Sequence, residues 1–245
     1  MKARYFLFVA SFFCVLHLSA QEKLRVEYDV VPYYESAKKN DFRVVTVSSS
    51  FELISDKSES QYTIIPKIDN TQTEISGIGN ISATMSADSN PVYKNTESKI
   101  YIEEARIAQK VFLIKDNLPQ IDWEITKETK EVAGFPVLKA TAVLTDEYKT
   151  EIEAWYSPKL SNKTGPDKLW GLPGIILEIQ TQINYDDGGK EGTKYFATKI
   201  EVLKSNEKIK IPNKGREITQ QEFDESQKAY LKKQMEMYNG GIDKD

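Results

Sequence analysis

Carboxylates are the side chains of this chain best suited to catalysis, because its one histidine, His17, and its one cysteine, Cys14, both lie near its start. Glu153 stands beside an Ala-Trp-Tyr segment, and Glu178 stands within a run of isoleucine and leucine. Two carboxyl groups about 5–10 Å apart across a cleft can hydrolyse a glycosidic bond when burial raises the pKa of one of them. The solvated face of a strand is the more ordinary place for each glutamate. A carboxylate-based hydrolase is therefore the alternative function, and no catalytic residue is assigned.

The first 20 residues predict export. Lys2 and Arg4 form a basic start, residues 6–18 are apolar, and Leu18-Ser19-Ala20 is typical of a signal-peptide cleavage site. Lipid attachment at Cys14 is an alternative that the two preceding phenylalanines disfavour. We expect residues 1–20 to be a signal peptide and the mature protein to be periplasmic, associated with the outer membrane, or secreted.

A mature chain of residues 21–245 has neither histidine nor cysteine. It therefore lacks the side chains for a Ser-His-Asp or Cys-His centre, for thiol redox chemistry, for a Cys/His zinc site and for disulfides. Asp186, Asp187 and Glu191 surround a Gly-Gly pair and offer oxygen ligands to calcium, but their spacing does not fit an EF-hand, and an ordinary hairpin turn is the preferred interpretation. We expect no metal and no cofactor.

The charge balance argues against nucleic acid as a partner. The chain has 33 basic and 37 acidic residues, for a net charge of −4, and carries no basic stripe with interleaved aromatic residues. No apolar run after the signal peptide is long enough to cross a membrane. The expected partners are a lipid, a peptide or another protein of the cell envelope.

Aromatic residues beside a turn form the candidate binding site. In the segment 165–178, GPDKLWGLPGIILE, Pro173 fixes φ near about −65° and Gly174 accepts a positive φ, which predicts a type II turn leading into a strand. Such a turn is either a purely architectural corner or the rim of a pocket for a glycan, peptide or lipid. Alternation along the preceding strand places its two aromatic residues on opposite faces. The predicted ligand-binding residues are Trp155, Tyr156, Trp170, Gly171, Leu172, Pro173 and Gly174.

Period-two alternation of apolar and polar residues predicts the elements that position this turn. Residues 69–98 look like surface loop with one edge strand near Ile75, Ile78 and Ile81, while Thr219 and Glu222 form a capping box that begins a helix at about 219–239. The fold class is mainly β (α+β), with a curved antiparallel sheet or half-barrel and a C-terminal helix, in a single domain over 21–245. The predicted strands are 24–30, 42–47, 51–55, 61–65, 99–105, 110–114, 123–127, 137–144, 152–157, 175–183 and 195–203.

Five ordered segments carry a resemblance to a known family. They are Trp123-Glu124-Ile125, GFPVLKA at 134–140, Ala154-Trp155-Tyr156, Gly165-Pro166 and GLPGIIL at 171–177. In this order they resemble the GLPGLI family of exported bacterial envelope proteins. The chain departs from that pattern at the GLPGII hexapeptide itself, at Phe135, and at Val137, where many members carry a cysteine. The resemblance implies export and a β-rich fold, and it brings no catalytic residues.

The function expected from these observations is non-catalytic binding of an apolar or extended ligand: a lipid, a lipoprotein or a peptide. A curved sheet capped by a helix is similar in outline to bacterial lipoprotein carriers, and an apolar hollow between sheet and helix would hold such a ligand. Two alternatives stay open: the carboxylate-based hydrolase, and a structural partner in an envelope complex.

Overall fold

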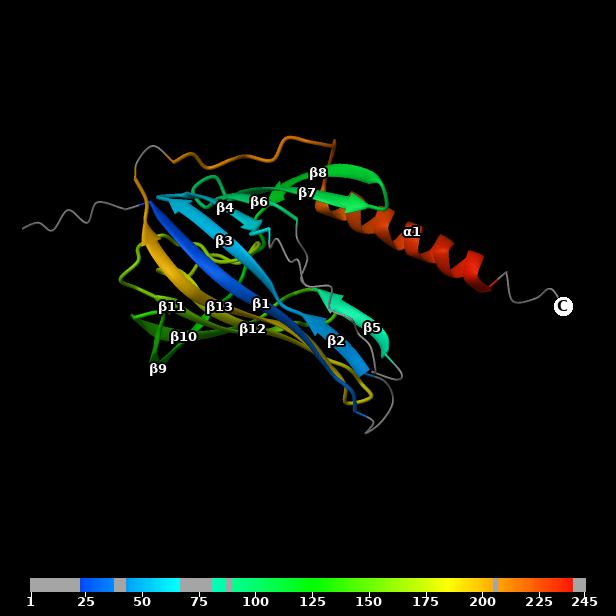
Figure 1. Cartoon of the computed structure of the whole chain (residues 1–245), viewed down its shortest axis with the longest axis horizontal. Helices are drawn as coiled ribbons and strands as arrows, with labels where there is room; N and C mark the ends of the chain where they lie inside the picture. The colour runs from blue at the N-terminus through cyan, green and yellow to red at the C-terminus, as the bar shows by residue number, and fades with distance from the viewer. Residues whose placement is uncertain (1–22, 38–42, 67–80, 87–89, 205–206, 240–245) are drawn as a thin grey trace, which may run out of the picture.

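One curved sheet of 12 strands dominates the computed structural model, which describes residues 23–37, 43–66, 81–86, 90–204 and 207–239. The described residues of its edge strands β14 and β9 do not pair with each other, so the sheet is unclosed (Figure 1). The predicted β-rich fold with one C-terminal helix is confirmed. In spatial order the strands are β14 (Arg216–Ile218), β8 (Lys110–Asn117), β7 (Ile100–Ile107), β6 (Val92–Asn95), β4 (Glu59–Ile64), β3 (Ser49–Asp56), β1 (Leu24–Glu35), β13 (Lys190–Val202), β12 (Ile175–Asn184), β11 (Glu151–Ser157), β10 (Phe135–Val143) and β9 (Glu124–Val132).

The central strand β1 shows how alternation produces the core. Val26, Tyr28 and Val30 are completely buried, whereas the residues between them are half-buried or exposed. On the other face, the Arg25 guanidinium lies 3.1 Å from a carboxylate oxygen of Glu52 on β3. One face of β1 therefore contributes to the core and the other carries surface ion pairs.

Two parts of the chain differ from the expected antiparallel arrangement. β14 pairs in parallel with β8, and β2 (Arg43–Val47) and β5 (Ile81–Ser86) form a separate parallel pair. The expectation of surface loop is wrong for β6, which lies inside the sheet between β4 and β7. β6 has four residues with a lysine among them, too little alternation to reveal a buried strand. Residues 67–80, including Ile75 and Ile78, lie outside the described residues, as does the predicted signal peptide, residues 1–20.

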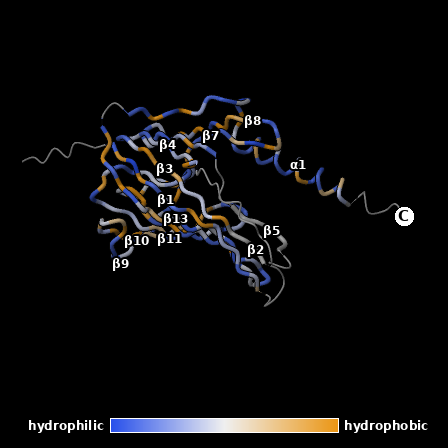
Figure 2. The backbone as a smooth tube through the Cα atoms, viewed as in Figure 1, coloured by the Kyte–Doolittle hydropathy of each residue, from blue (hydrophilic) through white to orange (hydrophobic). Residues whose placement is uncertain are grey.

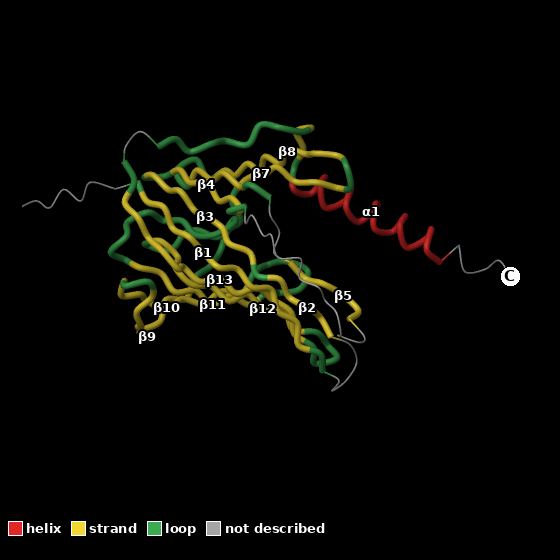
Figure 3. The backbone as a smooth tube through the Cα atoms, viewed as in Figure 1, coloured by secondary structure: helices red, strands yellow, loops and turns green. Residues whose placement is uncertain are grey.

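The helix α1 (Gln220–Asn239) begins at the predicted capping box. The Thr219 amide donates to the Glu222 carboxylate at 2.8 Å, and the Glu222 amide donates to the Thr219 hydroxyl at 3.3 Å. Phe223 is buried against Phe112 of β8, but the helix then projects away from the sheet (Figures 1 and 3). Among the described residues, the helix beyond Phe223 therefore does not cover the sheet as expected.

Hydropathy follows this arrangement. Apolar and polar residues alternate along the strands of the sheet. Both kinds also occur along α1 (Figure 2). Within the described part of the chain, no helix combines the length and the apolar character needed to span a membrane.

Candidate functional site

The connection between β11 and β12, residues 158–174, lies between two parts of the curved sheet, and we call it the inner loop. Leu169 and Leu172 pack in the apolar cluster built on β10, β11 and β12. On its other side, the Asn162 side chain donates a hydrogen bond of 2.9 Å to the hydroxyl of Ser55 on β3. The loop therefore contacts strands that are far apart in the order of the sheet.

A row of polar side chains holds the inner loop in place. Strand pairing aligns Ser55 with Ser60, Ser60 with Lys94, and Lys94 with Tyr101 across β3, β4, β6 and β7. All four side chains are buried. The Ser60 and Thr164 hydroxyl oxygens lie 2.9 Å apart. Because buried polar groups require partners, this row specifies where the loop can lie.

Lys94 is the member of the row that makes two hydrogen bonds to the inner loop. Its side chain is completely buried, and its ammonium donates to the carbonyl oxygens of Gly165 and Leu169, the latter at 3.1 Å. Burial lowers the pKa of Lys94 to about 7, although the nearby Asp167 carboxylate acts in the opposite direction. A buried amine thus ties two points of the inner loop to β6.

The glycines of the segment 165–178 act differently from what the sequence predicts. The predicted type II turn is wrong, because Gly174 does not have a positive φ; instead the Gly174 amide donates to the Leu172 carbonyl at 2.8 Å, a three-residue turn centred on Pro173. A Cβ atom at Gly174 would lie 2.0 Å from the Ser157 carbonyl oxygen. Glycine is needed at 174 for close approach of two backbones, and the positive φ, +99°, occurs at Gly171.

The residues predicted to bind a ligand divide into two groups. Trp155 and Tyr156 belong to different apolar clusters, in agreement with their expected opposite orientations. The residues that reach the surface all belong to the inner loop. Buried are Trp155, Tyr156, Leu172 and Gly174; half-buried or exposed are Trp170, Gly171 and Pro173.

A groove of about 730 Å³ runs beside Trp170 and Gly171, and it is the candidate functional site. Leu118 and Ile121 add apolar surface, and neutral polar side chains of β8 and the turns around it complete the lining. The charged residues that line it are two exposed lysines, Lys99 and Lys163. The sequence pointed to the tryptophan and the glycine but not to the lysines, which come from distant segments and form no local motif.

Hydrogen bonds fix the aromatic wall of this groove. The Trp170 indole donates to the Pro119 carbonyl at 2.7 Å, and the Trp123 indole donates to the Trp170 carbonyl at 2.9 Å. Trp170 also packs against the cluster that includes Phe223 of α1. The wall is therefore in place before any ligand arrives.

The two glutamates considered for catalysis are ion-paired. Glu178 lies 2.7 Å from the Lys130 ammonium, and Glu153 lies 3.0 Å from the Lys139 ammonium. Burial acts to raise the pKa of Glu153, but hydrogen bonds from Lys139 and the Trp155 indole more than offset it, so this pKa lies below its ordinary value. A general acid needs a raised pKa, so Glu153 is not suited to donate the proton in the hydrolase alternative.

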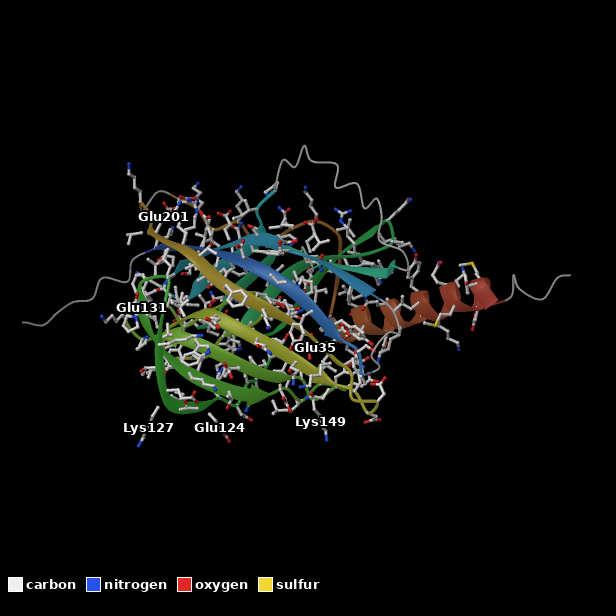
Figure 4. The ribbon with its side chains drawn as sticks, turned by 60° about the horizontal axis from the view of Figure 1, so that its bottom comes forward. Glu35, Glu124, Lys127, Glu131, Lys149 and Glu201 are labelled. Carbon is white, nitrogen blue, oxygen red and sulfur yellow. The ribbon has the colours of Figure 1, made fainter. Side chains whose placement is uncertain are left out.

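A second groove, of about 590 Å³, lies over β9–β12. Asp122, Glu124, Glu151 and Glu153 contribute to its lining, together with Gln180 and Gln182. Figure 4 shows Glu124 projecting outward with other charged residues of this region. The strongly acidic lining contrasts with the two lysines of the groove beside Trp170.

The Asp186–Glu191 region forms the hairpin turn between β12 and β13. The Tyr185 amide donates to the Gly189 carbonyl at 2.9 Å, and the Gly189 amide donates to the Asp187 carboxylate at 2.9 Å. Glu191 accepts a hydrogen bond of 2.8 Å from the Tyr185 hydroxyl. Across the described residues, no group of three or more His, Cys, Asp or Glu side chains is arranged to hold a metal ion.

Comparison with known families adds one match. A family model described as a protein of unknown function (Porph_ging) matches residues 144–178, which include β11, the inner loop and the start of β12. A search of curated proteins found no match. The matched segment thus contains the architectural elements just described, and it brings no assigned activity.

Comparison with solved structures shows likeness in fold. Two structures of PNGF-II are similar, with TM-scores of 0.53 and 0.51 and identities of 18% and 17%; each match covers 85% of this chain. The chain spans about a third of PNGF-II, 34% and 33% in the two structures. A LolA superfamily protein from Nitrosomonas europaea has a TM-score of 0.31 at 9% identity, over 75% of this chain and 87% of that one. A putative outer membrane lipoprotein-sorting protein domain from Vibrio parahaemolyticus has 0.31 at 7%, over 78% and 89%.

Proposed function

We propose that this chain is an exported, non-catalytic binding protein, periplasmic or associated with the outer membrane, that holds an extended or apolar ligand such as a lipid, a lipoprotein or a peptide. The groove beside Trp170 and Gly171 is its binding site. The observation that carries the proposal is the combination there of a fixed indole, an exposed glycine backbone and apolar side chains in a groove of about 730 Å³. Small-molecule sites commonly join apolar walls to a few polar groups in this way.

Charge supports a ligand with an anionic end. The chain as a whole carries a net charge of −4, yet the charged residues lining the groove are Lys99 and Lys163. A positive groove on an acidic protein attracts negative groups of a ligand while the rest of the surface repels them. The apolar part of the ligand would then lie against Trp170, Leu118 and Ile121.

Export and family membership are further parts of the proposal. Export rests on the basic, apolar and small-residue order of residues 1–20. Membership of the GLPGLI family rests on the five ordered segments between Trp123 and Leu177; those from Ala154 onward fall within the segment 144–178 that matches a family of unknown function.

Charge reversal at the groove tests the proposal. The double variant Lys99→Glu/Lys163→Glu keeps the fold, because both side chains are exposed, but reverses the charge of the groove. The matched control is Lys127→Glu/Lys149→Glu on a different part of the surface (Figure 4); Lys149 shares with Lys99 a positive φ, 49° against 56°. Titration with dodecanoate and with an acidic hexapeptide, followed by tryptophan fluorescence, measures binding.

We expect the groove variant to weaken binding of at least one of these probes by about tenfold or more, since each lost charge contact contributes on the order of 1 kcal/mol. The control should bind as the unaltered protein does. Mass spectrometry of material that copurifies from the periplasm should show the same difference. Equal binding by both variants, or no binding by the unaltered protein, would overturn the assignment of the groove.

A further inference from the structure

A third, smaller cavity is lined in part by the inner loop. Its volume is about 160 Å³, and Asp167 and Lys168 of the loop contribute to its lining. Val30, Phe51 and Val92 form an apolar wall on the strands opposite. The Phe51 ring is stacked on that of Tyr62, with the centroids 4.9 Å apart and the rings within 4° of parallel. None of these residues lines the groove beside Trp170.

The polar side of this cavity contains both signs of charge. Glu103 is already occupied, since one oxygen accepts from Lys168 at 2.9 Å and the other from Asn90 at 2.8 Å. Asp167 is different: no hydrogen bond joins its carboxylate to another side chain or amide in the described part of the chain, and its φ is +49°. Lys168 has three N–H groups and uses one of them for Glu103.

Tyr62 supplies a further unsatisfied group. Its side chain is 3% exposed, and its hydroxyl oxygen is buried without a hydrogen-bond partner among the described residues. A buried hydroxyl without a partner is costly, so native structures keep few of them. The Tyr62 ring packs against Phe51, but its hydroxyl, on a residue that lines the cavity, still lacks a hydrogen-bond partner among the described residues, which points to a ligand as that partner.

We propose that this cavity binds a compact zwitterion, namely an α-amino acid with a short apolar side chain. Its ammonium group would lie at the Asp167 carboxylate, its carboxylate would accept hydrogen bonds from Lys168 and Tyr62, and its side chain would contact the wall formed by Val30 and Val92.

Size and charge select this class of ligand. An apolar cavity of about 150 Å³ holds one benzene molecule, so a cavity of this size admits a small amino acid but no chain. A simple cation would meet the Lys168 ammonium, and a simple anion would meet the Asp167 carboxylate. A molecule that carries both charges offers the Asp167 carboxylate a cation and gives Lys168, which is already paired with Glu103, a second acceptor.

Calorimetric titration with valine tests the proposal, with isobutylamine and isobutyrate as probes that each keep one of its two charges. We expect valine to bind at least about tenfold more tightly than either half-molecule. Asp167→Asn, which retains a side chain that tolerates positive φ, and Tyr62→Phe should each weaken valine binding about fivefold or more. Asp187→Asn, in the hairpin turn between β12 and β13, is the matched control and should bind valine unchanged.

Stability separates a binding role for Tyr62 from a structural one. Because Tyr62→Phe removes an unsatisfied hydroxyl, we expect it to raise the thermal midpoint of the ligand-free protein while it weakens valine binding. The groove variant Lys99→Glu/Lys163→Glu should bind valine normally, so the two sites are judged separately. The proposal is overturned if valine does not bind at millimolar concentration, in which case the cavity holds water only, or if neither cavity variant changes its affinity.

Discussion

Among single residues, Lys94 makes stability depend on pH. Burial lowers its pKa in the folded protein to about 7, against 10.5 for an ordinary lysine. Between these values the unfolded chain binds more protons than the folded one, so the contribution of Lys94 to the free energy of unfolding rises with pH across this window. Asp167 is the charged group that opposes the shift.

Replacement by methionine tests this effect. Relative to Lys94→Met, the unaltered protein should gain on the order of 2–3 kcal/mol in free energy of unfolding between about pH 6.5 and about pH 9.5, measured by urea denaturation. The variant also leaves the Gly165 and Leu169 carbonyls without their donor, which lowers its stability at every pH, so the slope with pH is the informative quantity. Parallel pH profiles for the two proteins would contradict the lowered pKa.

The two kinds of glycine make a second residue-scale prediction. Gly174→Ala places a Cβ atom against the Ser157 carbonyl, which is backbone and cannot turn aside, so we expect a loss of more than about 3 kcal/mol or failure to fold. Gly134 has φ +80°, but a Cβ atom added there would have nothing within 4 Å, so Gly134→Ala should cost only about 1–2 kcal/mol. Chemical denaturation compares them; similar losses would show that contact with Ser157 does not require glycine.

At the scale of elements, α1 is attached at one end. Phe223 is buried in the cluster with Phe112, whereas Met235 and Tyr238 are 65% and 76% exposed. We therefore expect Phe223→Ala to destabilise the protein by about 2–4 kcal/mol and Met235→Ala to stay within about 0.5 kcal/mol of the unaltered protein. Thermal unfolding followed by circular dichroism measures both. A large effect of Met235→Ala would mean that the projecting part of the helix packs against something.

At the scale of the whole molecule, local sequence patterns predicted most strands, but they did not predict that the inner loop is buried between parts of the sheet. The alternation of Val26, Tyr28 and Val30 is visible in the sequence because it repeats along one strand. Burial of the inner loop depends instead on strands β3, β4 and β6, which lie far from it in the sequence and return to contact it. A segment rich in glycine and proline looks like surface loop unless those contacts are known. Only part of the groove was predicted from the sequence. Trp170 lies in the segment 165–178, but Lys99 comes from a distant part of the chain and reaches the groove only through the fold.

The enclosed position of the inner loop leads to a prediction about local opening. The Leu169 amide donates to the Pro166 carbonyl at 3.1 Å inside the fold, whereas the Lys149 amide donates to the Asp146 carbonyl at 3.3 Å in an exposed turn. If the loop is part of the core, its opening requires separation of the sheet, so the Leu169 amide should exchange hydrogen as slowly as that of Val26 in β1. The Lys149 amide should exchange orders of magnitude faster through local fraying. Native-state hydrogen exchange measured by NMR distinguishes the two cases. Fast exchange at Leu169 with slow exchange at Val26 would show that the inner loop opens independently of the sheet. The row of polar side chains would then hold a separately opening segment rather than form part of a single cooperative core.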